Sequence, residues 1–214
     1  YDTKDKKVVW SDRWQEKWDN LPTIKGSLSD GLLKALDTKP KVEQKVDTTN
    51  PEAYEFYLKA KHKYEKRENT DDTEIARGLL SKAIELDDNL ILAKVLLGLT
   101  YHDMGDYDKA MEIYTPTLIQ ATELGDKYGI SSSLMYIGDL YINRGEFDKA
   151  IDYAKKSLKI QKELGDKFNM AKSLHVFGDA YHYKNDYAKS LNYCERALVI
   201  QKQLYVKRGM GDTI

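Results

Sequence analysis

The sequence predicts an all-α fold: an α-α superhelix of about four helical hairpins, with a small strand-plus-helix remnant in front. Two observations indicate it. When the chain is shifted by 40 residues, Gly98, Gly138 and Gly178 fall into register, and residues 124–127 (LGDK) recur as residues 164–167. Within each unit, apolar residues recur at intervals of three and four, which is the spacing of one face of an α-helix. Self-similarity at a period of 20–50 residues is typical of stacked repeats.

Glycines divide each unit into two helices. Gly105 and Gly145 follow the first apolar stretch of a unit, and Gly125 and Gly165 follow the second. Because glycine adopts the left-handed backbone conformation without a steric penalty, it commonly ends helices. Asp126 then stands where its side chain can cap the next helix. Each repeat is therefore predicted to be two antiparallel helices joined by a tight turn.

Small residues are expected to face each other inside the hairpin. Gly138 lies on the first helix and Ala150 on the second, twelve residues later. We expect Leu134 and Tyr141 to supply bulk around this close approach. Cys194 is predicted to be a buried structural thiol rather than a nucleophile, because it occupies an inward repeat position.

The motifs resemble tetratricopeptide repeats. The resemblance is carried by residues 97–101 (LGLTY), 137–141 (IGDLY) and 177–181 (FGDAY), and continues in residues 105–110 and 145–150. The usual repeat has 34 residues, so the extra six are expected to lengthen both helices. The period alone also suits HEAT units, but the positions of glycine, tyrosine and alanine favour the tetratricopeptide interpretation.

We expect the repeat array to span residues 51–207. Before the first regular repeat lies a divergent one, with an enlarged loop predicted at residues 69–72. After the last, residues 208–214 are expected to begin a truncated repeat or form a tail. The predicted repeats are residues 51–89, 90–127, 128–167 and 168–207.

Residues 1–49 do not repeat and are interpreted as a partial domain plus a linker. Residues 8–14 are predicted to be a strand and residues 21–36 a helix. Residues 10–14 (WSDRW) and 20–25 (NLPTIK) are similar to the end of the TolB-like domain. In bacteria that domain often separates an adenylate or guanylate cyclase catalytic domain from tetratricopeptide repeats. Because the first residue is Tyr1, we expect the chain to be a piece of a longer protein.

Composition excludes several classes of function. Asp and Glu number 35 and Lys and Arg 34, a balance that argues against binding to nucleic acid. The longest apolar stretches, such as residues 90–93, are too short for membrane insertion. A single cysteine rules out an internal disulfide framework and suits a reducing, cytoplasmic setting.

The sequence predicts neither a cofactor-binding site nor a catalytic site. The spacings H-x-x-x-H, H-E-x-x-H and C-x-x-C do not occur, so we expect no metal site. Neither a dinucleotide fingerprint nor a phosphate-binding loop is present in a suitable context, and we expect no cofactor. The fragment itself is predicted not to be an enzyme, although a longer protein could carry a catalytic domain upstream.

The resemblance implies a binding groove, because in this family the first helix of each repeat lines the concave side. A carboxylate in such a groove can accept hydrogen bonds from a peptide or pair with its Lys or Arg. The alternative is that these aspartates bond within the hairpin or face water. Only Lys172 matches the pattern of members that clamp a carboxy-terminal peptide, which disfavours that mode. The expected groove residues are Leu99, His102, Met135, Tyr136, Asp139, Asn143, Lys172, His175, Asp179, His182 and Tyr183.

The sequence thus predicts a protein-protein interaction scaffold that binds a peptide or partner segment. We expect it to serve as a regulatory region of a larger bacterial signalling protein such as a nucleotide cyclase. The alternative is a self-association module, a homo-oligomer with no separate peptide ligand, because solenoid ends with uncovered apolar faces invite association.

Overall fold

A computed structural model of the chain describes the backbone of residues 50–211 and the side chains up to residue 205. This part of the chain is helical throughout apart from short turns, which confirms the all-α prediction. The strand and helix predicted in residues 1–49 lie outside the described residues. The helices are α2 (Pro51–Glu65), α3 (Thr70–Leu86), α4 (Ile91–Asp103), α5 (Tyr107–Leu124), α6 (Lys127–Asn143), α7 (Phe147–Leu164), α8 (Lys167–Tyr183) and α9 (Tyr187–Gly211).

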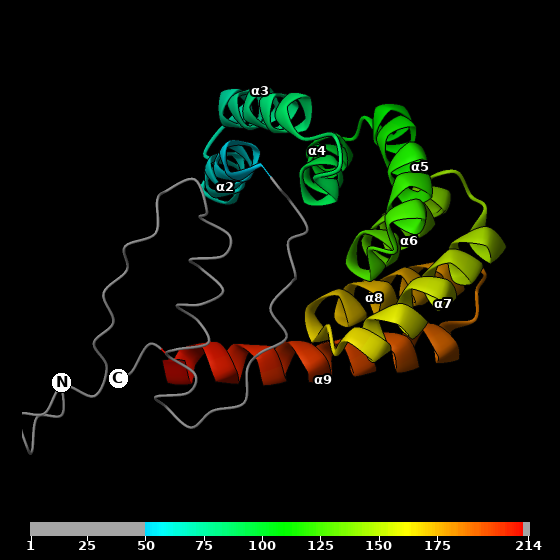
Figure 1. Ribbon diagram of the computed structural model, residues 1–214. Coiled ribbons are helices and arrows are strands. Elements are labelled where there is room, and N and C mark those ends of the chain that lie inside the picture. Colours follow the sequence, from blue (N-terminus) through cyan, green and yellow to red (C-terminus); the bar gives the residue numbers. More distant parts are fainter. Residues whose placement is uncertain (1–49, 212–214) are drawn as a thin grey trace, which may run out of the picture.

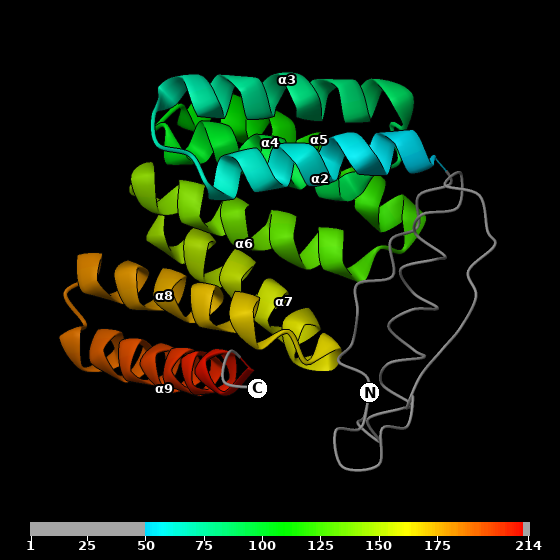
Figure 2. The same cartoon turned by 90° about the vertical axis from the view of Figure 1, so that its left-hand side faces the viewer.

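The helices pair in chain order and stack into a curved array. Figure 1 shows the pairs following one another around an arc, with α2, α4, α6 and α8 toward its inner side. Helices α3, α5 and α7 lie toward the outer side. Turned by 90°, the same helices appear as successive layers of rods (Figure 2). This is the predicted superhelix, and its inner surface is formed by the first helix of every pair.

Positive backbone φ angles mark the turns. Gly105 and Gly145 have φ of 79° and 73°, and Gly125 and Gly165 have 69° and 66°. These values lie in the left-handed region, as the sequence pattern indicates. In the last pair, Asn185 occupies the position of Gly105 and Gly145 and adopts φ of 61°. Asparagine is the residue other than glycine that best tolerates this conformation.

Side-chain caps begin several of the helices, although α4 and α7 begin without one. Asn50 accepts hydrogen bonds from the backbone N–H groups of Glu52 and Ala53, immediately before Pro51 opens α2. Asp126 accepts from two backbone N–H groups at the start of α6, and Asp166 accepts from one at the start of α8. Each cap satisfies a donor that the first helical turn leaves unpaired. The capping role predicted for Asp126 is therefore confirmed.

In the last three pairs the two helices meet at a glycine. A Cβ atom added at Gly138 would lie 3.2 Å from the Ala150 carbonyl oxygen, which confirms the predicted close approach. At Gly98 and Gly178 the added atom would lie 2.6 Å from the Tyr114 ring and from the Cys194 Sγ, respectively. Even a methyl group is therefore too large at two of these positions. The Cys194 side chain faces Gly178, as its repeat position indicates, but Cys194 is half-buried and not fully buried as predicted.

A buried polar network joins the third and fourth hairpins. The Ser157 hydroxyl donates to the Ser131 carbonyl oxygen at 2.7 Å, and the Gln161 Nε2 donates to the Ser157 Oγ at 2.7 Å. The Ser173 hydroxyl donates to the Gln161 Oε1 at 2.9 Å, and all four residues are 0% exposed. Because an unpaired buried polar group is costly, this network favours a single register of α6, α7 and α8.

Two predicted boundaries are wrong. The enlarged loop does not cover residues 69–72, because Asn69 caps a helix that begins at Thr70; the turn between the helices is residues 66–69. Residues 208–211 continue α9 instead of starting a new unit. The second and third pairs end their second helix at Gly125 and Gly165, whereas Tyr205 stands at this position in α9. Tyr205 does not supply the left-handed glycine cap that ends α5 and α7.

Two glycine substitutions are expected to change stability in opposite directions. Gly145→Ala should lower the free energy of unfolding by about 1–2 kcal/mol, because alanine at positive φ is strained. Gly78→Ala should raise it by about 0.5–1 kcal/mol, because Gly78 lies inside α3 and its added Cβ meets no atom within 4 Å. Urea unfolding followed by circular dichroism measures both, and effects of the same sign would contradict the assignment of the turn.

Candidate functional site: the inner surface of α4, α6 and α8

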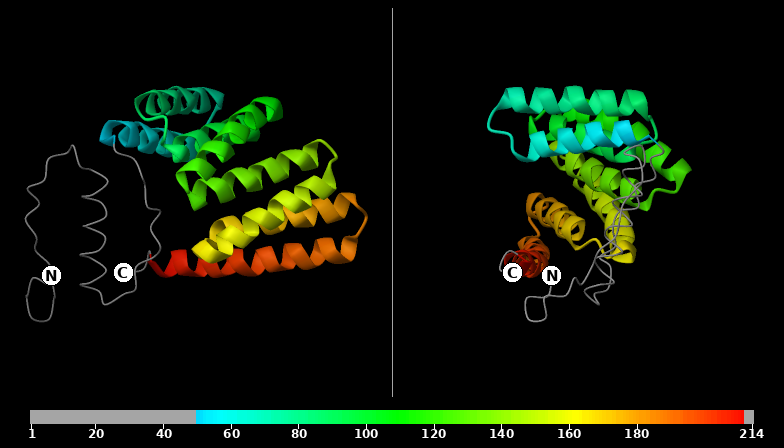
Figure 3. Two further views of the ribbon diagram at one scale, coloured as in Figure 1. Left: turned by 45° about the vertical axis from the view of Figure 1, so that its right-hand side comes forward. Right: turned by 60° about the vertical axis from the view of Figure 1, so that its left-hand side comes forward.

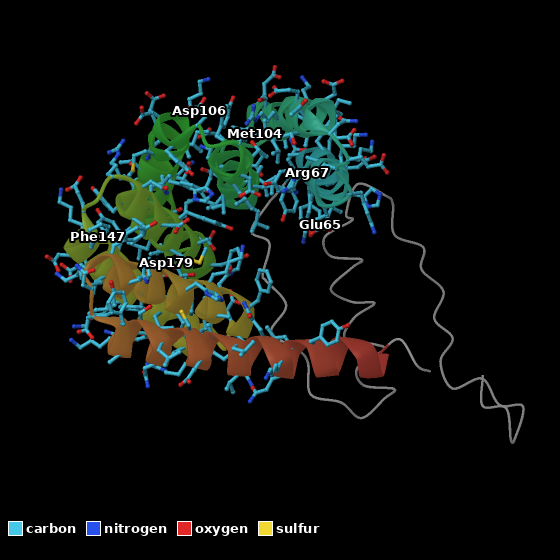
Figure 4. The ribbon with its side chains drawn as sticks, turned by 180° about the vertical axis from the view of Figure 1, so that it is seen from behind. Glu65, Arg67, Met104, Asp106, Phe147 and Asp179 are labelled. Atoms are coloured by element: carbon cyan, nitrogen blue, oxygen red, sulfur yellow. The ribbon has the colours of Figure 1, made fainter. Side chains whose placement is uncertain are left out.

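The predicted groove residues all lie on three inner helices. Leu99 and His102 belong to α4, and Met135, Tyr136, Asp139 and Asn143 belong to α6. The remaining five are on α8: Lys172, His175, Asp179, His182 and Tyr183. In Figure 4 the labelled residues Arg67, Met104, Asp106 and Phe147 follow one another along the arc, because each lies at or near the turn after an inner helix.

His102 links two neighbouring repeats. Its Nε2 lies 2.7 Å from Asp139 Oδ2 on α6, and its Nδ1 lies 3.4 Å from Asp103 Oδ1 on α4. The His102 and Asp139 side chains are 18% and 31% exposed. The Tyr107 ring packs edge-on against the imidazole, with the centroids 5.7 Å apart. The Asp139 carboxylate is therefore occupied by a contact between repeats, an arrangement that neither sequence-based alternative included.

The same chain of contacts reaches α2. The Tyr64 hydroxyl donates to Asp103 Oδ2 at 2.5 Å, and Arg67 Nη2 donates to the same oxygen at 3.1 Å. The Arg67 guanidinium also lies over the Tyr64 ring, 4.0 Å from its centroid. Tyr64, Arg67, His102, Asp103 and Asp139 thus connect the first three repeats, and we call them the inter-repeat ladder. The ladder uses hydrogen bonds to charged groups, which are stronger than neutral ones.

The ladder changes the acidity of its members. Burial alone would lower the pKa of His102, but the hydrogen bonds and charges of Asp103 and Asp139 outweigh it and raise that pKa to about 9. Burial would raise the pKa of Asp103, yet hydrogen bonds from His102 and Tyr64 and the charge of Arg67 hold it below its usual value. At neutral pH the ladder therefore holds an imidazolium between two carboxylates.

Two predicted groove residues are buried instead. Met135 is 2% exposed and Tyr136 is 8% exposed, and both belong to the core between the second and third hairpins. The Tyr136 ring stacks on Tyr114 of α5 with centroids 5.0 Å apart. The prediction that these two side chains face a partner is therefore wrong, because the neighbouring repeat covers them. The Tyr136 hydroxyl still accepts a hydrogen bond from Lys172 of α8.

Lys172 presents a cation without a carboxylate partner among the described residues. Its Nζ donates to the Tyr136 hydroxyl at 3.1 Å and lies over the Phe168 ring, 4.9 Å from the centroid. Burial lowers the pKa of Lys172, although the charges of nearby aspartates, Asp139 among them, oppose the shift. The ammonium is held by aromatic and hydroxyl contacts alone, so it can still pair with an anion.

Asp179 presents the opposite charge two turns further along α8 (Figure 4). It is exposed, and within the described part of the chain it has neither an ion pair nor a hydrogen bond. Partial burial raises the pKa of Asp179, and the negative charge of Asp139 adds to the rise. His175 and His182 act in the opposite direction. Unlike Asp139, this carboxylate is available to a donor from outside.

Aromatic and polar side chains flank Asp179. The Tyr183 ring is 58% exposed and stacks on Phe147, with centroids 5.3 Å apart and planes 6° apart. His182 contacts both Tyr183 and Tyr187 edge-on. His175 contacts Gln201 of α9 through a ring nitrogen at 3.0 Å. These residues form a wall of aromatic faces beside the carboxylate.

Asn143 and Leu99 have smaller roles. The exposed Asn143 side chain donates to the Asp139 carbonyl oxygen at 3.3 Å, and the half-buried Leu99 packs against the core. Within residues 50–211 no group of three or more His, Cys, Asp or Glu side chains is arranged to hold a metal ion. In the same part of the chain, none of the helices has the length and apolar character needed to cross a membrane.

Sequence reasoning missed Tyr64, Arg67 and Phe147. Tyr64 lies four residues after Ala60, just as His102 lies four residues after Gly98, so the two share one repeat position. The substitution of alanine for glycine in the divergent repeat concealed this alignment. Phe147 shares its repeat position with Tyr107, and the recurrence of an aromatic residue there could have indicated its role.

The class of protein now follows from the fold and from a family comparison. The tetratricopeptide repeat family profile matches residues 89–163 and 129–203, which together cover more than half of the chain. The chain belongs to the tetratricopeptide repeat family. The glycine turns and glycine–helix contacts described above are the physical basis of that pattern.

Two solved structures share the fold. BtubC (BKLC) from P. vanneervenii superimposes with a TM-score of 0.57 at 16% identity, over 87% of this chain and 76% of that one. MamA superimposes with a TM-score of 0.51 at 21% identity, over 90% of this chain and 99% of that one. At these identities the likeness establishes the helical array alone. No curated protein sequence matches the chain.

The ladder is expected to make stability depend on pH. Because the pKa of His102 is about 9 when folded and 6.5 when unconstrained, its contribution is complete below pH 6.5 and is lost as the pH rises through 9. Between pH 6 and pH 9.5 the free energy of unfolding should fall by an amount on the order of 1–3 kcal/mol. Urea unfolding at both values measures it. His102→Gln should remove most of the difference, and an equal fall in this variant would refute the assignment.

Proposed function

We propose that the array is a protein-interaction scaffold that binds an extended segment of a partner against the inner surface of α4, α6 and α8. The observation that supports this most directly is the pair of unneutralised charges on α8. Lys172 and Asp179 have no ion-pair partner in the described part of the chain, whereas Asp103 and Asp139 are engaged by the ladder. Charges that the protein does not neutralise itself are suited to recognition.

The spacing of the two charges defines the chemistry of the partner. Seven residues of helix separate Lys172 from Asp179, which corresponds to about 10 Å along α8. An extended chain advances about 3.3 Å per residue. A carboxylate and a basic side chain about three residues apart would therefore reach Lys172 and Asp179 together.

The aromatic wall favours arginine as the basic residue. A guanidinium group can pair with a carboxylate through two parallel hydrogen bonds and stack on an aromatic face at the same time. Asp179 supplies the carboxylate, and Tyr183 supplies an exposed ring one helical turn later. Lysine offers the charge but not the planar stacking surface.

Selection from a phage-displayed library of random peptides tests the groove. Peptides of ~12 residues, long enough to span both charges in extended form, are selected on the full chain. We expect enrichment of an acidic and a basic residue about three positions apart. Asp179→Lys should abolish selection of the basic residue and favour an acidic one. Asp179→Ala should weaken the selected peptides roughly tenfold in fluorescence anisotropy, because a charge-assisted contact of ~1.4 kcal/mol is lost.

Glu112→Lys provides the matched control, because Glu112 is exposed on the outer helix α5. It changes net charge as Asp179→Lys does and should leave the selected sequences unchanged. Asp139 is a poor choice for this test because its loss would leave His102 without its partner. Equal effects of the Asp179 and Glu112 variants, or selected peptides without a charge pattern, would exclude the groove.

Self-association through α9 is a second candidate. Leu191 and Leu198 are 61% and 47% exposed, one on each of two turns of the same face. Leu158 holds the position of Leu198 in the previous repeat and is only 8% exposed, because it packs with Leu174 and Val176 of α8. An uncovered apolar face of this kind favours pairing with a second copy.

Sedimentation velocity of the full chain at several concentrations measures self-association. If α9 pairs between copies, the sedimentation coefficient should rise with concentration, and Leu191→Asp combined with Leu198→Asp should abolish the rise. Ile75→Asp combined with Ile119→Asp changes two other exposed apolar residues and should not. A strictly monomeric chain would eliminate this candidate.

The wider context rests on the resemblance of residues 1–36 to the TolB-like domain. We propose that the array is a regulatory region of a larger bacterial, cytoplasmic signalling protein such as a nucleotide cyclase. The segment lies outside the described residues, and the family match begins at residue 89. A natural reading frame without a catalytic domain upstream of Tyr1 would remove this proposal.

A further inference from the structure

The outer side of the array contains a crevice between α7 and α9. Figures 1 and 3 show these two second helices as neighbouring rods near the end of the array. The crevice encloses about 420 Å³. Its apolar lining comes from the buried Leu158 of α7 and Leu174 of α8, the half-buried Met170 and Ile200, and the exposed Val199 of α9.

Cations dominate the rim of this crevice. Lys162 of α7 and Arg196 of α9 line the crevice itself, next to Glu195. Lys155 and Lys159 continue the row of cations along the same face of α7, in an adjoining hollow. Among the described residues, none of these four cations forms an ion pair. Most other exposed lysines of the array do pair, as Lys127 does with Glu163 at 3.0 Å. The positive charge along this face is thus left without an internal partner.

An apolar lining with a cationic rim fits one kind of partner better than others. An amphipathic helix can insert leucine-like side chains at i, i+3 and i+7 while its carboxylates reach the rim. The hollows along α7 extend from Asp152 to Glu163, a length of about 16 Å or three helical turns. Short acidic amphipathic helices match this length, this charge and this apolar surface.

The same features count against nucleic acid. The side chains lining the crevice include no aromatic ring on which a base could stack. The apolar lining also contributes nothing to phosphate binding, which depends on charge.

We propose that the crevice between α7 and α9 is a second docking surface, which binds an acidic amphipathic helix of a partner protein. It is framed by the second helices α7 and α9, with Met170 and Leu174 of α8 between them, and its lining includes neither Lys172 nor Asp179. The array can therefore hold two partner segments at once. This surface is independent of the proposed groove, and each can fail its test without the other.

A designed peptide tests the proposal on the full chain. The probe is a fluorescein-labelled peptide of about 14 residues, four helical turns, with leucines on one face and glutamates on the other. We expect saturable binding in fluorescence anisotropy that weakens as salt rises. Lys155→Glu combined with Lys159→Glu and Lys162→Glu should weaken it at least tenfold. Val199→Glu should do the same by placing a carboxylate in the apolar lining.

The chain supplies a matched control for each change. Ile119 of α5 shares the repeat position of Val199 and is similarly exposed, 58% against 55%, so Ile119→Glu should leave binding unchanged. Glutamate substitutions of Lys59, Lys61 and Lys66 on α2 and its turn match the triple charge reversal and should also leave it unchanged. Circular dichroism shows whether each variant keeps its helices.

Several results would overturn the proposal. A scrambled peptide of identical composition that binds as tightly would show that charge alone acts. Absence of saturable binding, or equal loss in the Ile119 and Val199 variants, would remove the surface as a peptide site. Tighter binding of single-stranded oligothymidine or of phosphatidylserine vesicles, lost in the triple lysine variant, would assign the rim to phosphates instead. Loss of peptide binding in Asp179→Lys, with the crevice intact, would place the probe in the inner groove.

Discussion

The structure depends on the close approach of two helices at a glycine in each regular hairpin. At Gly138 the backbone of α6 comes so near to α7 that an added Cβ would lie 3.2 Å from a carbonyl oxygen. At Gly98 and Gly178 the facing side chain fills the space directly. This contact fixes the rotation of the first helix about its own axis. Once that rotation is fixed, the residues around it on each first helix must point to the next hairpin or to the inner surface. The set of side chains that line the groove therefore depends on this contact.

The inter-repeat ladder uses polar groups to join hairpins that also pack through apolar clusters. His102 is hydrogen-bonded to the Asp139 carboxylate of the following repeat. Asp103 accepts hydrogen bonds from Tyr64 and Arg67 of the preceding repeat. Such partly buried charges stabilise the array only because each has a partner in the neighbouring repeat. As a consequence, the two halves of the inner surface differ in the charges that they offer to a partner. Its first half is neutralised internally, and the half on α8 retains separate positive and negative charges for a partner.

The two proposed surfaces would attract their partners through different interactions. The inner surface offers isolated charges beside exposed rings, which suits an extended segment with few but well-placed side chains. The outer crevice offers a continuous apolar lining, so burial of apolar area supplies the attraction and the lysine rim supplies orientation. Because α7 and α9 form one surface and α8 forms most of the other, the last two hairpins contribute to both. The buried network around Gln161 holds these hairpins in register and so keeps both surfaces intact.

The sequence by itself determined the glycine turns and the glycine contacts within the three regular hairpins. These features are local: they repeat every 40 residues and depend on glycine conformation, capping and the 3.6-residue period. Only the tertiary structure decided which inner-helix side chains are covered by the next repeat. Met135 and Tyr136 are buried in the core, and Asp139 is hydrogen-bonded to His102. The small rotation between successive hairpins sets both contacts. That rotation results from the summed packing of both hairpins, so a linear pattern of residues does not specify it. Asp139 is paired and Asp179 is free to bind because the preceding repeat places His102 beside Asp139 but has Ile142 at the equivalent position before Asp179.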